Sequence, residues 1–156
     1  MTSVRASSSA AQATRTLFLA EPRPVYRPRA PLVADCSVIA SSLFEEVDAG
    51  QATEALRDHE LHAPALLPFE FANVARSKSR AGAPAERVAM VLRAFEGLRV
   101  ELHPVDVTRL HALALRHGIT AYDAAYLALA LALPAPLLTF DRGLADAAAR
   151  AQGEPR

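Results

Sequence analysis

Four acidic side chains fall at the ends of apolar segments in this chain of 156 residues, where carboxylates can gather around a metal ion. Asp35 ends the apolar run at residues 32–34, and Asp141 ends a second run at residues 137–140. Glu70 and Asp123 each fall in the first turn of an expected helix. Carboxylates near a core are costly unless something pairs with them, so these four predict a cation site. The chemistry expected of such a site is metal-dependent, with phosphate as its substrate group.

Magnesium suits this pattern for a physical reason. Carboxylates that lie close together repel one another, and a hard divalent cation relieves that repulsion. Mg²⁺ prefers one or two carboxylates, with waters and substrate phosphate oxygens as its other ligands. An ion held in this way can orient a phosphodiester, polarise it and activate water for in-line attack.

A purely structural role is open for each acid. Thr120 and Asp123 have the spacing of a capping box, with Asp in place of the usual Glu or Gln. Glu70 can favour a helix N-terminus through the helix dipole. Asp35 can start a turn, and Asp141 can form an Asx-turn. The shared position beside apolar runs favours a common site over four separate structural roles.

Strand-like and helix-like segments alternate from residue 31 onward and must position these acids. Strands are predicted at residues 32–35, 61–66, 99–103 and 136–140. Helices are predicted at residues 38–47, 51–59, 68–81, 84–98, 106–117, 120–133 and 143–151, with Ser37 as the first N-cap and Gly118 as a left-handed helix end. This alternation predicts an α/β fold with a parallel sheet covered on both faces. Ligands bind such sheets beyond the carboxyl ends of the strands, where Asp35 and Asp141 fall.

Four short motifs carry these acids in a specific order and spacing. They are Val33-Ala34-Asp35-Cys36-Ser37, Glu70-Phe71-Ala72-Asn73-Val74, Tyr122-Asp123-Ala124-Ala125-Tyr126 and Leu138-Thr139-Phe140-Asp141-Arg142. The motifs resemble those of PIN-domain ribonucleases, and most closely those of VapC-like toxins of bacterial toxin–antitoxin pairs. The resemblance covers about residues 31–151.

The resemblance implies a PIN-like three-layer α/β/α sandwich with a central, mostly parallel sheet of four or five strands. It also implies RNA cleavage that depends on Mg²⁺ or Mn²⁺, frequent homodimers and inhibition by a cognate antitoxin. The catalytic and metal-binding quartet of the family corresponds to Asp35, Glu70, Asp123 and Asp141. Its supporting polar positions correspond to Ser37, Thr139 and Asn73, and for Asn73 a plain surface role is equally open.

Basic side chains near the acids are candidates for RNA binding. The helix after Glu70 carries Arg76, Lys78 and Arg80, of which the two arginines share a face. Arg142 lies beside Asp141 and suits a bidentate phosphate contact. A solvated helix surface is the alternative for the three residues of the helix.

The two ends of the chain depart from the family pattern. Residues 1–30 carry five arginines and one glutamate, and three interpretations compete: a disordered arm, a basic arm that contacts nucleic acid or a partner, and an organellar transit peptide. The fold is expected to occupy residues 31–151, followed by a tail at 152–156. Family members often carry a further strand after the last helix, and no apolar run here supplies it.

Composition and charge exclude several classes of protein. The net charge is zero, and the chain after residue 30 is acidic, which excludes a broadly basic nucleic-acid binder. The single cysteine, Cys36, excludes an internal disulfide framework, fits a reducing, cytoplasmic compartment and is expected to pack rather than react.

The five histidines are scattered without zinc-ligand spacing, so nothing is expected to pair them. No apolar run is long enough to span a membrane.

Two other classes of protein compete with a nuclease. A phosphoacceptor signalling domain also collects acids at the ends of a parallel sheet. It needs an acidic pair after its first strand and a lysine that ends a late strand, whereas the only lysine here is Lys78, within a helix. A catalytically inactive PIN-like binding module is disfavoured by the presence of all four acids.

Overall fold

A parallel sheet of four strands forms the centre of the protein. The structure is a computed structural model that describes residues 29–133 and 135–153. The strands are β1 (Pro31–Ala34), β2 (Glu60–Pro64), β3 (Val100–His103) and β4 (Leu137–Leu138), in the spatial order β3-β2-β1-β4. The helices of the described residues are α1 (Cys36–Phe44), α2 (Ala49–Asp58), α3 (Leu67–Arg80), α4 (Ala85–Glu96), α5 (Val107–His117), α6 (Ala121–Ala132) and α7 (Arg142–Gln152). The predicted α/β class is therefore confirmed.

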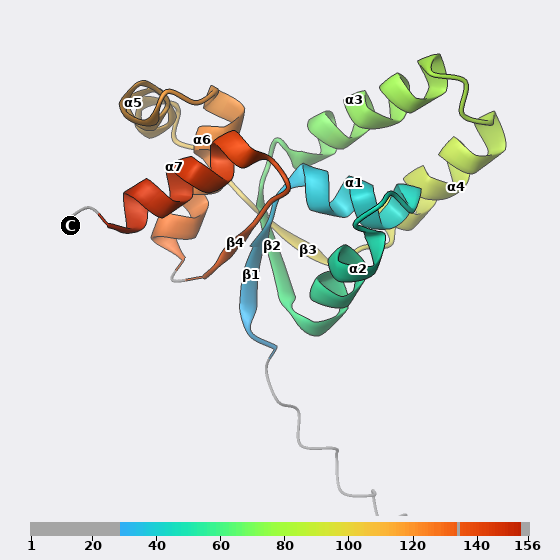
Figure 1. Cartoon of the computed structure of the whole chain (residues 1–156), viewed down its shortest axis with the longest axis horizontal. Helices are drawn as coiled ribbons and strands as arrows, with labels where there is room; N and C mark the ends of the chain where they lie inside the picture. The colour runs from blue at the N-terminus through green and yellow to red at the C-terminus, as the bar shows by residue number, and fades with distance from the viewer. Residues whose placement is uncertain (1–28, 134, 154–156) are drawn as a thin grey trace, which may run out of the picture.

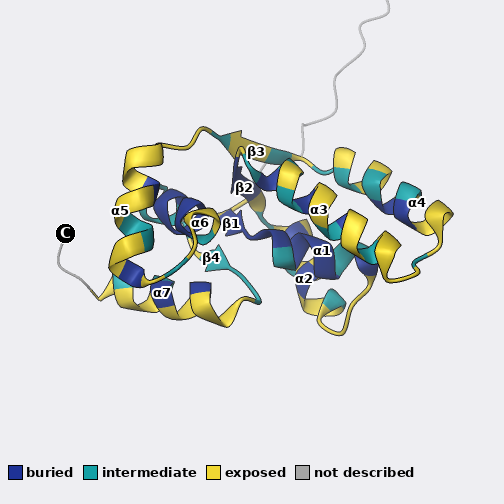
Figure 2. Ribbon diagram, turned by 90° about the horizontal axis from the view of Figure 1, so that it is seen from above, coloured by how far each residue is buried: buried dark blue, intermediate teal, exposed yellow. Residues whose placement is uncertain are grey.

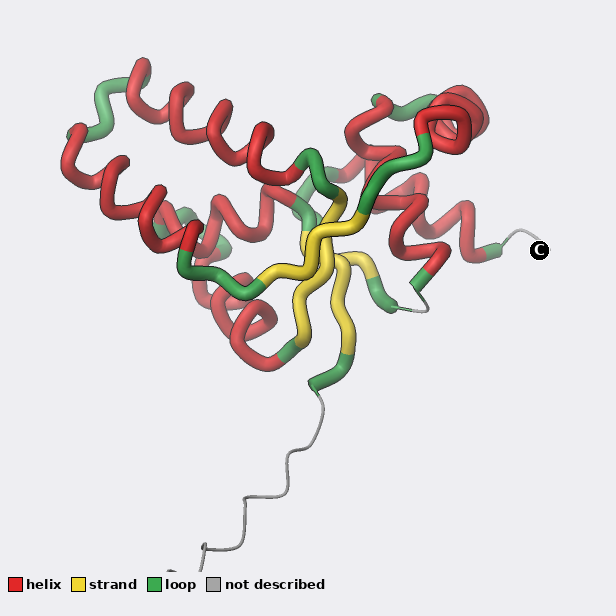
Figure 3. Tube along the Cα trace, turned by 180° about the vertical axis from the view of Figure 1, so that it is seen from behind, coloured by secondary structure: helices red, strands yellow, loops and turns green. Residues whose placement is uncertain are grey.

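Helices cover both faces of this sheet. Figure 1 shows α5, α6 and α7 on one side and α1 to α4 on the other, and the view from behind in Figure 3 agrees. Helix α6 contacts β1, β2 and β4, and both α5 and α7 pack on α6. On the opposite side α1 contacts α2, α3 and α4. The three-layer sandwich implied by the resemblance is present.

The core explains why these segments hold their places. Val33 and Ala34 of β1 have no exposed surface, as expected of a strand buried on both faces. Residues 124–129 of α6 are all buried, and Figure 2 shows buried residues concentrated on the inner sides of the two helix layers. The ring of Phe71 on α3 stacks 4.1 Å from that of Phe95 on α4. These contacts fix the two helices that start at the carboxyl edge of the sheet, α3 and α6.

The start and end of α1 differ from the prediction. Asp35, not Ser37, is the N-cap residue, and Ser37 lies in the first turn of the helix. The hydroxyl of Ser37 donates to the Asp35 carboxylate instead of capping a helix N–H. The helix ends at Phe44, and Val47, predicted to belong to its apolar face, is fully exposed.

The last strand is short and forms one edge of the sheet. Only Leu137 and Leu138 pair with β1, fewer than the five residues predicted, and the hydroxyl of Thr139 just after them donates to Asp35. No further strand follows α7 within residues 135–153. Gly118 ends α5 with a φ of 66°, which confirms its predicted left-handed conformation.

Two predictions concern parts of the chain that the structure barely covers. The basic arm at residues 1–30 lies outside the described residues, apart from residues 29 and 30, and so does most of the tail at 152–156. None of the described helices has the length and apolar character needed to cross a membrane.

Candidate metal-binding active site

The acidic residues meet at the edge of the sheet where β1 and β4 end. The strand order reverses between these strands, because β2 and β3 lie to one side of β1 and β4 lies to the other. Connections that diverge at such a reversal leave a crevice at the carboxyl ends of the strands. One pocket at this place is lined by all four predicted acids and by both flanking polar residues of α1 and α3: Asp35, Ser37, Glu70, Asn73, Asp123 and Asp141.

Two hydroxyl groups hold the carboxylate of Asp35. This side chain is 7% exposed, and its Oδ2 accepts hydrogen bonds from Ser37 Oγ at 2.5 Å and from Thr139 Oγ1 at 2.8 Å. The same hydroxyls accept backbone N–H groups, Phe140 N at 3.1 Å from Ser37 and Asp141 N at 3.0 Å from Thr139. The network joins α1 to the segment after β4 and fixes the orientation of Asp35.

Glu70 is held by a tyrosine from the opposite helix layer. The hydroxyl of Tyr126 on α6 donates to Glu70 Oε2 at 2.6 Å. Burial raises the pKa of Glu70, the nearby charges of Asp35 and Asp123 raise it further, and the Tyr126 hydrogen bond opposes the rise. Tyr126 falls in the third of the sequence motifs, but no site role was predicted for it. A buried tyrosine hydroxyl needs a partner, and that requirement was the sequence signal for its role.

Asp123 and Asp141 cap helices and also line the pocket. Asp123 Oδ2 accepts from Thr120 N at 3.3 Å and from Thr120 Oγ1 at 2.7 Å, which completes a capping box at the start of α6. Asp141 Oδ1 accepts from Leu144 N at 2.8 Å at the start of α7. A Cβ at Gly143 would lie 3.2 Å from this Oδ1, so the glycine leaves room for the carboxylate. Each of these two acids therefore caps a helix and lines the pocket at the same time.

The four carboxylates share a pattern that suits a cation. In the hydrogen bonds of the described residues, each uses a single oxygen for protein donors: Oδ2 of Asp35, Oε2 of Glu70, Oδ2 of Asp123 and Oδ1 of Asp141. The second oxygen of each side chain is left for another ligand. None of the ion pairs within the described ranges includes any of the four. Oxygen donors of this kind fit a hard divalent cation.

Aromatic and basic groups surround the acids unevenly. Phe69 and Tyr122 also line the pocket and are 73% and 60% exposed, and neither was predicted as a site residue. The predicted RNA-binding residues lie outside the pocket lining, and Arg76, Arg80 and Arg142 are exposed. Lys78 instead pairs with Glu46 and lies over the ring of Phe44.

The prediction made for Cys36 is confirmed, whereas the prediction made for the histidines is wrong. Burial and the nearby charges of Glu70 and Asp35 raise the pKa of Cys36 to about 12, so its thiol stays neutral and packs, as expected. The expectation that nothing pairs the histidines is wrong for two of them. His62 Nδ1 lies 3.0 Å from His103 Nε2, because the register of β2 and β3 places them together.

The α/β sandwich and the carboxylate pocket at its strand-order reversal define the class of this protein, and the oxygen donors of that pocket suit a cation at the sheet edge. The PIN domain profile matches residues 32–150. Ribonuclease VapC3 of Pyrobaculum aerophilum is 38% identical over 121 residues, which cover 74% of this chain and 92% of the relative. Ribonuclease VapC9 of Mycobacterium tuberculosis is 34% identical over 118 residues, covering 74% and 89%. The chain belongs to the PIN-domain family, and its curated relatives are VapC ribonucleases.

A solved structure supports the fold independently. The crystal structure of PAE2754 from Pyrobaculum aerophilum superposes with a TM-score of 0.58 at 18% identity, over 76% of this chain and 79% of the other. At that identity the likeness concerns the fold alone. The PIN-like sandwich expected from the motifs is thus confirmed by sequence and by structure.

Proposed function

We propose that this protein is a metal-dependent endoribonuclease and the toxin of a toxin–antitoxin pair. The single observation that carries the proposal is the pocket in which Asp35, Glu70, Asp123 and Asp141 each keep one oxygen for a ligand. Membership of a family whose curated relatives are named ribonucleases supports the reaction class. The four carboxylates hold Mg²⁺ or Mn²⁺, which when bound neutralises phosphate charge and polarises the scissile phosphodiester.

The residues of the chain divide the remaining work. Ser37 and Thr139 keep Asp35 in one orientation, so that this carboxylate is arranged for binding before RNA arrives. Glu70, with its raised pKa, is the carboxylate best suited to accept a proton from the attacking water. Asn73, which lies exposed in the pocket lining one turn after Glu70, donates to a phosphate oxygen of the RNA in this proposal.

The rim of the pocket suits a single-stranded RNA. Bases that are unstacked can lie against exposed aromatic rings, which Phe69 of α3 and Tyr122 of α6 supply in the lining of the pocket. Arg76 and Arg80 on α3, and Arg142 on α7, supply charge for the flanking phosphates. Lys78 contributes less, since Glu46 already neutralises it.

The proposed function includes two protein partners, a second copy of this chain and an antitoxin. A VapC-type toxin has a cognate antitoxin, and we place this protein in the cytoplasm as a homodimer that such an antitoxin inhibits. The outer edge of β4, which no described strand covers, is one surface on which a second chain can add.

The decisive experiment uses purified full-length protein freed of any antitoxin. With Mg²⁺ or Mn²⁺ it should cleave cellular RNA, and chelation should stop the cleavage. Sequencing of RNA ends after brief induction, compared between wild type and Asp35→Asn, would identify the target at the same time. Cleavage that is absent in the wild type would leave the inactive binding module as the better description. Cleavage that is equal in the two proteins would remove Asp35 from the site.

A further inference from the structure

Three potential metal ligands converge on β2 and β3, toward the edge of the sheet opposite β4. His62 on β2 is the register partner of Glu101 on β3, and His103 lies two residues beyond Glu101. Side chains alternate along a strand, so Glu101 and His103 share one face, and the pairing brings His62 to the same face. The cluster therefore follows from strand register, between the two strands farthest from β4.

The spacing of the donor atoms matches a tetrahedral metal site. His62 Nδ1 lies 3.0 Å from His103 Nε2 and 3.7 Å from Glu101 Oε2, and His103 Nε2 lies 3.7 Å from Glu101 Oε1. Zinc bonds of about 2.0–2.1 Å place the ligands of a tetrahedron about 3.3–3.4 Å apart. In the described part of the chain, this is the one group of three possible ligands whose donor atoms lie within 4.8 Å of one another.

We propose that His62, Glu101 and His103 form a site for a borderline divalent metal such as Zn²⁺, which ties the edge strand β3 to β2. Imidazole nitrogens favour this class of metal, whereas the all-oxygen acidic pocket favours Mg²⁺ or Mn²⁺. Two histidines and one carboxylate also leave a fourth position for water.

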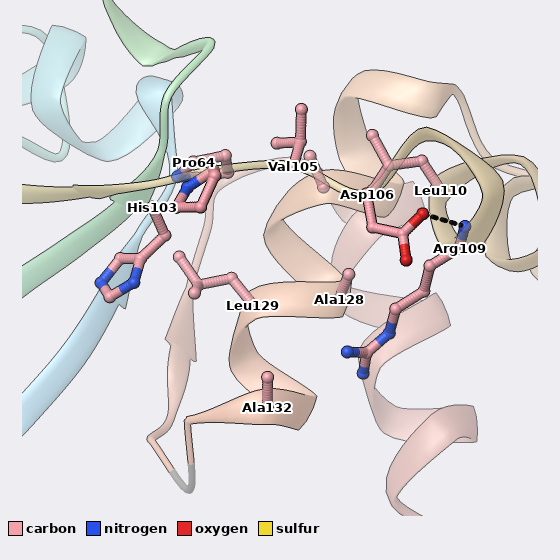
Figure 4. A pocket seen from close by; sticks show the side chains of 11 residues that line it. Pro64, His103, Val105, Asp106, Arg109, Leu110, Ala128, Leu129 and Ala132 are labelled. Atoms are coloured by element: carbon pink, nitrogen blue, oxygen red, sulfur yellow. Dashed lines mark hydrogen bonds between the residues drawn. The ribbon is translucent and has the colours of Figure 1, made fainter.

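Burial gives the site a closed side and an open side. The side chains of His62, His103 and Glu101 are 9%, 21% and 61% exposed, so an ion can enter past the glutamate. Figure 4 shows the ring of His103 beside Leu129 and turned away from Asp106 and Arg109, at the other end of the cavity between β3, α5 and α6. Apolar neighbours such as Leu129 and Pro64 reduce the access of water to the imidazole ligands.

The test is Zn²⁺ binding by the full chain in excess Mg²⁺, which occupies oxygen-donor sites. We expect one equivalent of Zn²⁺ to bind and to raise the melting temperature. Co²⁺ should show the intense visible absorption of tetrahedral coordination by nitrogen, which carboxylate-only octahedral sites lack. Replacing a ligand by His103→Gln or Glu101→Gln should weaken Zn²⁺ binding by more than about 100-fold, since changes to outer-shell partners alone cost roughly 10–100-fold.

Matched variants make the result decisive. His111→Gln changes an exposed histidine on α5 and should leave Zn²⁺ binding unchanged, and Asp123→Asn should do the same. Glu101→Gln alters a well-exposed side chain, so it remains informative if His103→Gln fails to fold. Either of two results overturns the proposal: no Zn²⁺ bound in excess Mg²⁺, which leaves a hydrogen-bonded histidine pair only, or equal binding by Glu101→Gln and the wild type.

Discussion

Two side-chain clusters on the same sheet show how differently a parallel strand arrangement can assemble ligands. The acidic pocket collects its carboxylates from strand ends and helix starts around the β1–β4 reversal. The histidine cluster of His62, Glu101 and His103 collects its donors from the middle and end of two paired strands. Helix caps and hydroxyl groups hold the acidic pocket, whereas strand register holds the histidine cluster. The acidic pocket therefore suits an ion that keeps many of its waters, and the histidine cluster suits an ion bound directly by protein ligands.

The contrast also concerns charge. Burial raises the pKa of Glu70 in the acidic pocket, and the charges of Asp35 and Asp123 raise it further. Among the residues the structure describes, no three of the four carboxylates lie as close together as the three ligands of the histidine cluster. A cation is needed to bring such groups together. Two imidazoles and one carboxylate carry less charge, and they approach one another without help.

The largest expected effect is the loss of RNA cleavage when one residue of the acidic pocket is replaced and the histidine cluster is left intact. Asp123→Asn removes a charge from the acidic pocket but keeps an oxygen for the Thr120 cap. RNA cleavage should fall by more than the roughly 10–100-fold typical of outer-shell changes. The free energy of unfolding should stay within about 1 kcal/mol of the wild-type value. Cleavage assays and denaturant melts measure both, with His103→Gln as the control that should keep full cleavage.

A smaller effect is expected from the hydroxyl that orients Asp35. Thr139→Val removes the 2.8 Å hydrogen bond to Oδ2 and the acceptor for Asp141 N. Cleavage should fall roughly 10–100-fold, the range for second-shell partners of a metal ligand. Higher Mg²⁺ concentrations should restore part of it, because the loss is in metal affinity. A loss that is unaffected by Mg²⁺ would assign Thr139 to substrate contact instead.

The pH dependence of cleavage tests the Tyr126 contact. Its hydrogen bond lowers the pKa of Glu70, so Tyr126→Phe should raise that pKa. Glu70 then takes up its proton at a higher pH, and the acidic limb of the rate profile should move to higher pH. A hydrogen bond to a charged group is worth about 1.5–3 kcal/mol, and half-burial reduces the effect. An acidic limb that stays in place would show that Glu70 does not control it.

The smallest expected effect concerns the basic face of α3. Arg76→Ala and Arg80→Ala should each weaken RNA binding a few-fold and reduce the magnitude of its salt slope by about one. Lys78→Ala is the matched control, because Lys78 already pairs with Glu46. Equal losses for all three variants would indicate a general charge effect rather than contacts from one face.

The acidic pocket could be predicted from sequence because its geometry depends on strand ends. Asp35 and Asp141 follow apolar runs, and the parallel arrangement brings such positions to one edge. The start of α1 was mispredicted because Ser37 resembles an N-cap locally, whereas its hydroxyl is used by Asp35 and Phe140. That competition involves a residue more than a hundred positions away, which no local pattern contains.

The histidine cluster and the Tyr126 contact could not be predicted for a related reason. His62 and His103 are separated by 41 positions, and only the register of β2 against β3 brings them together. Shifting this register by one residue would turn one ring to the opposite face. The Tyr126 contact with Glu70 likewise depends on how α6 and α3 meet across the sheet.

The double use of Asp123 and Asp141 has an evolutionary consequence. Each carboxylate caps a helix that the fold requires, and loss of such a cap costs about 0.5–2 kcal/mol. A mutation that abolishes activity at either position therefore also lowers the amount of folded protein, unless the new residue can still cap the helix. A replacement that still caps, such as Asn or Ser, is therefore a route by which a lineage could lose the activity and still retain an abundant, folded protein.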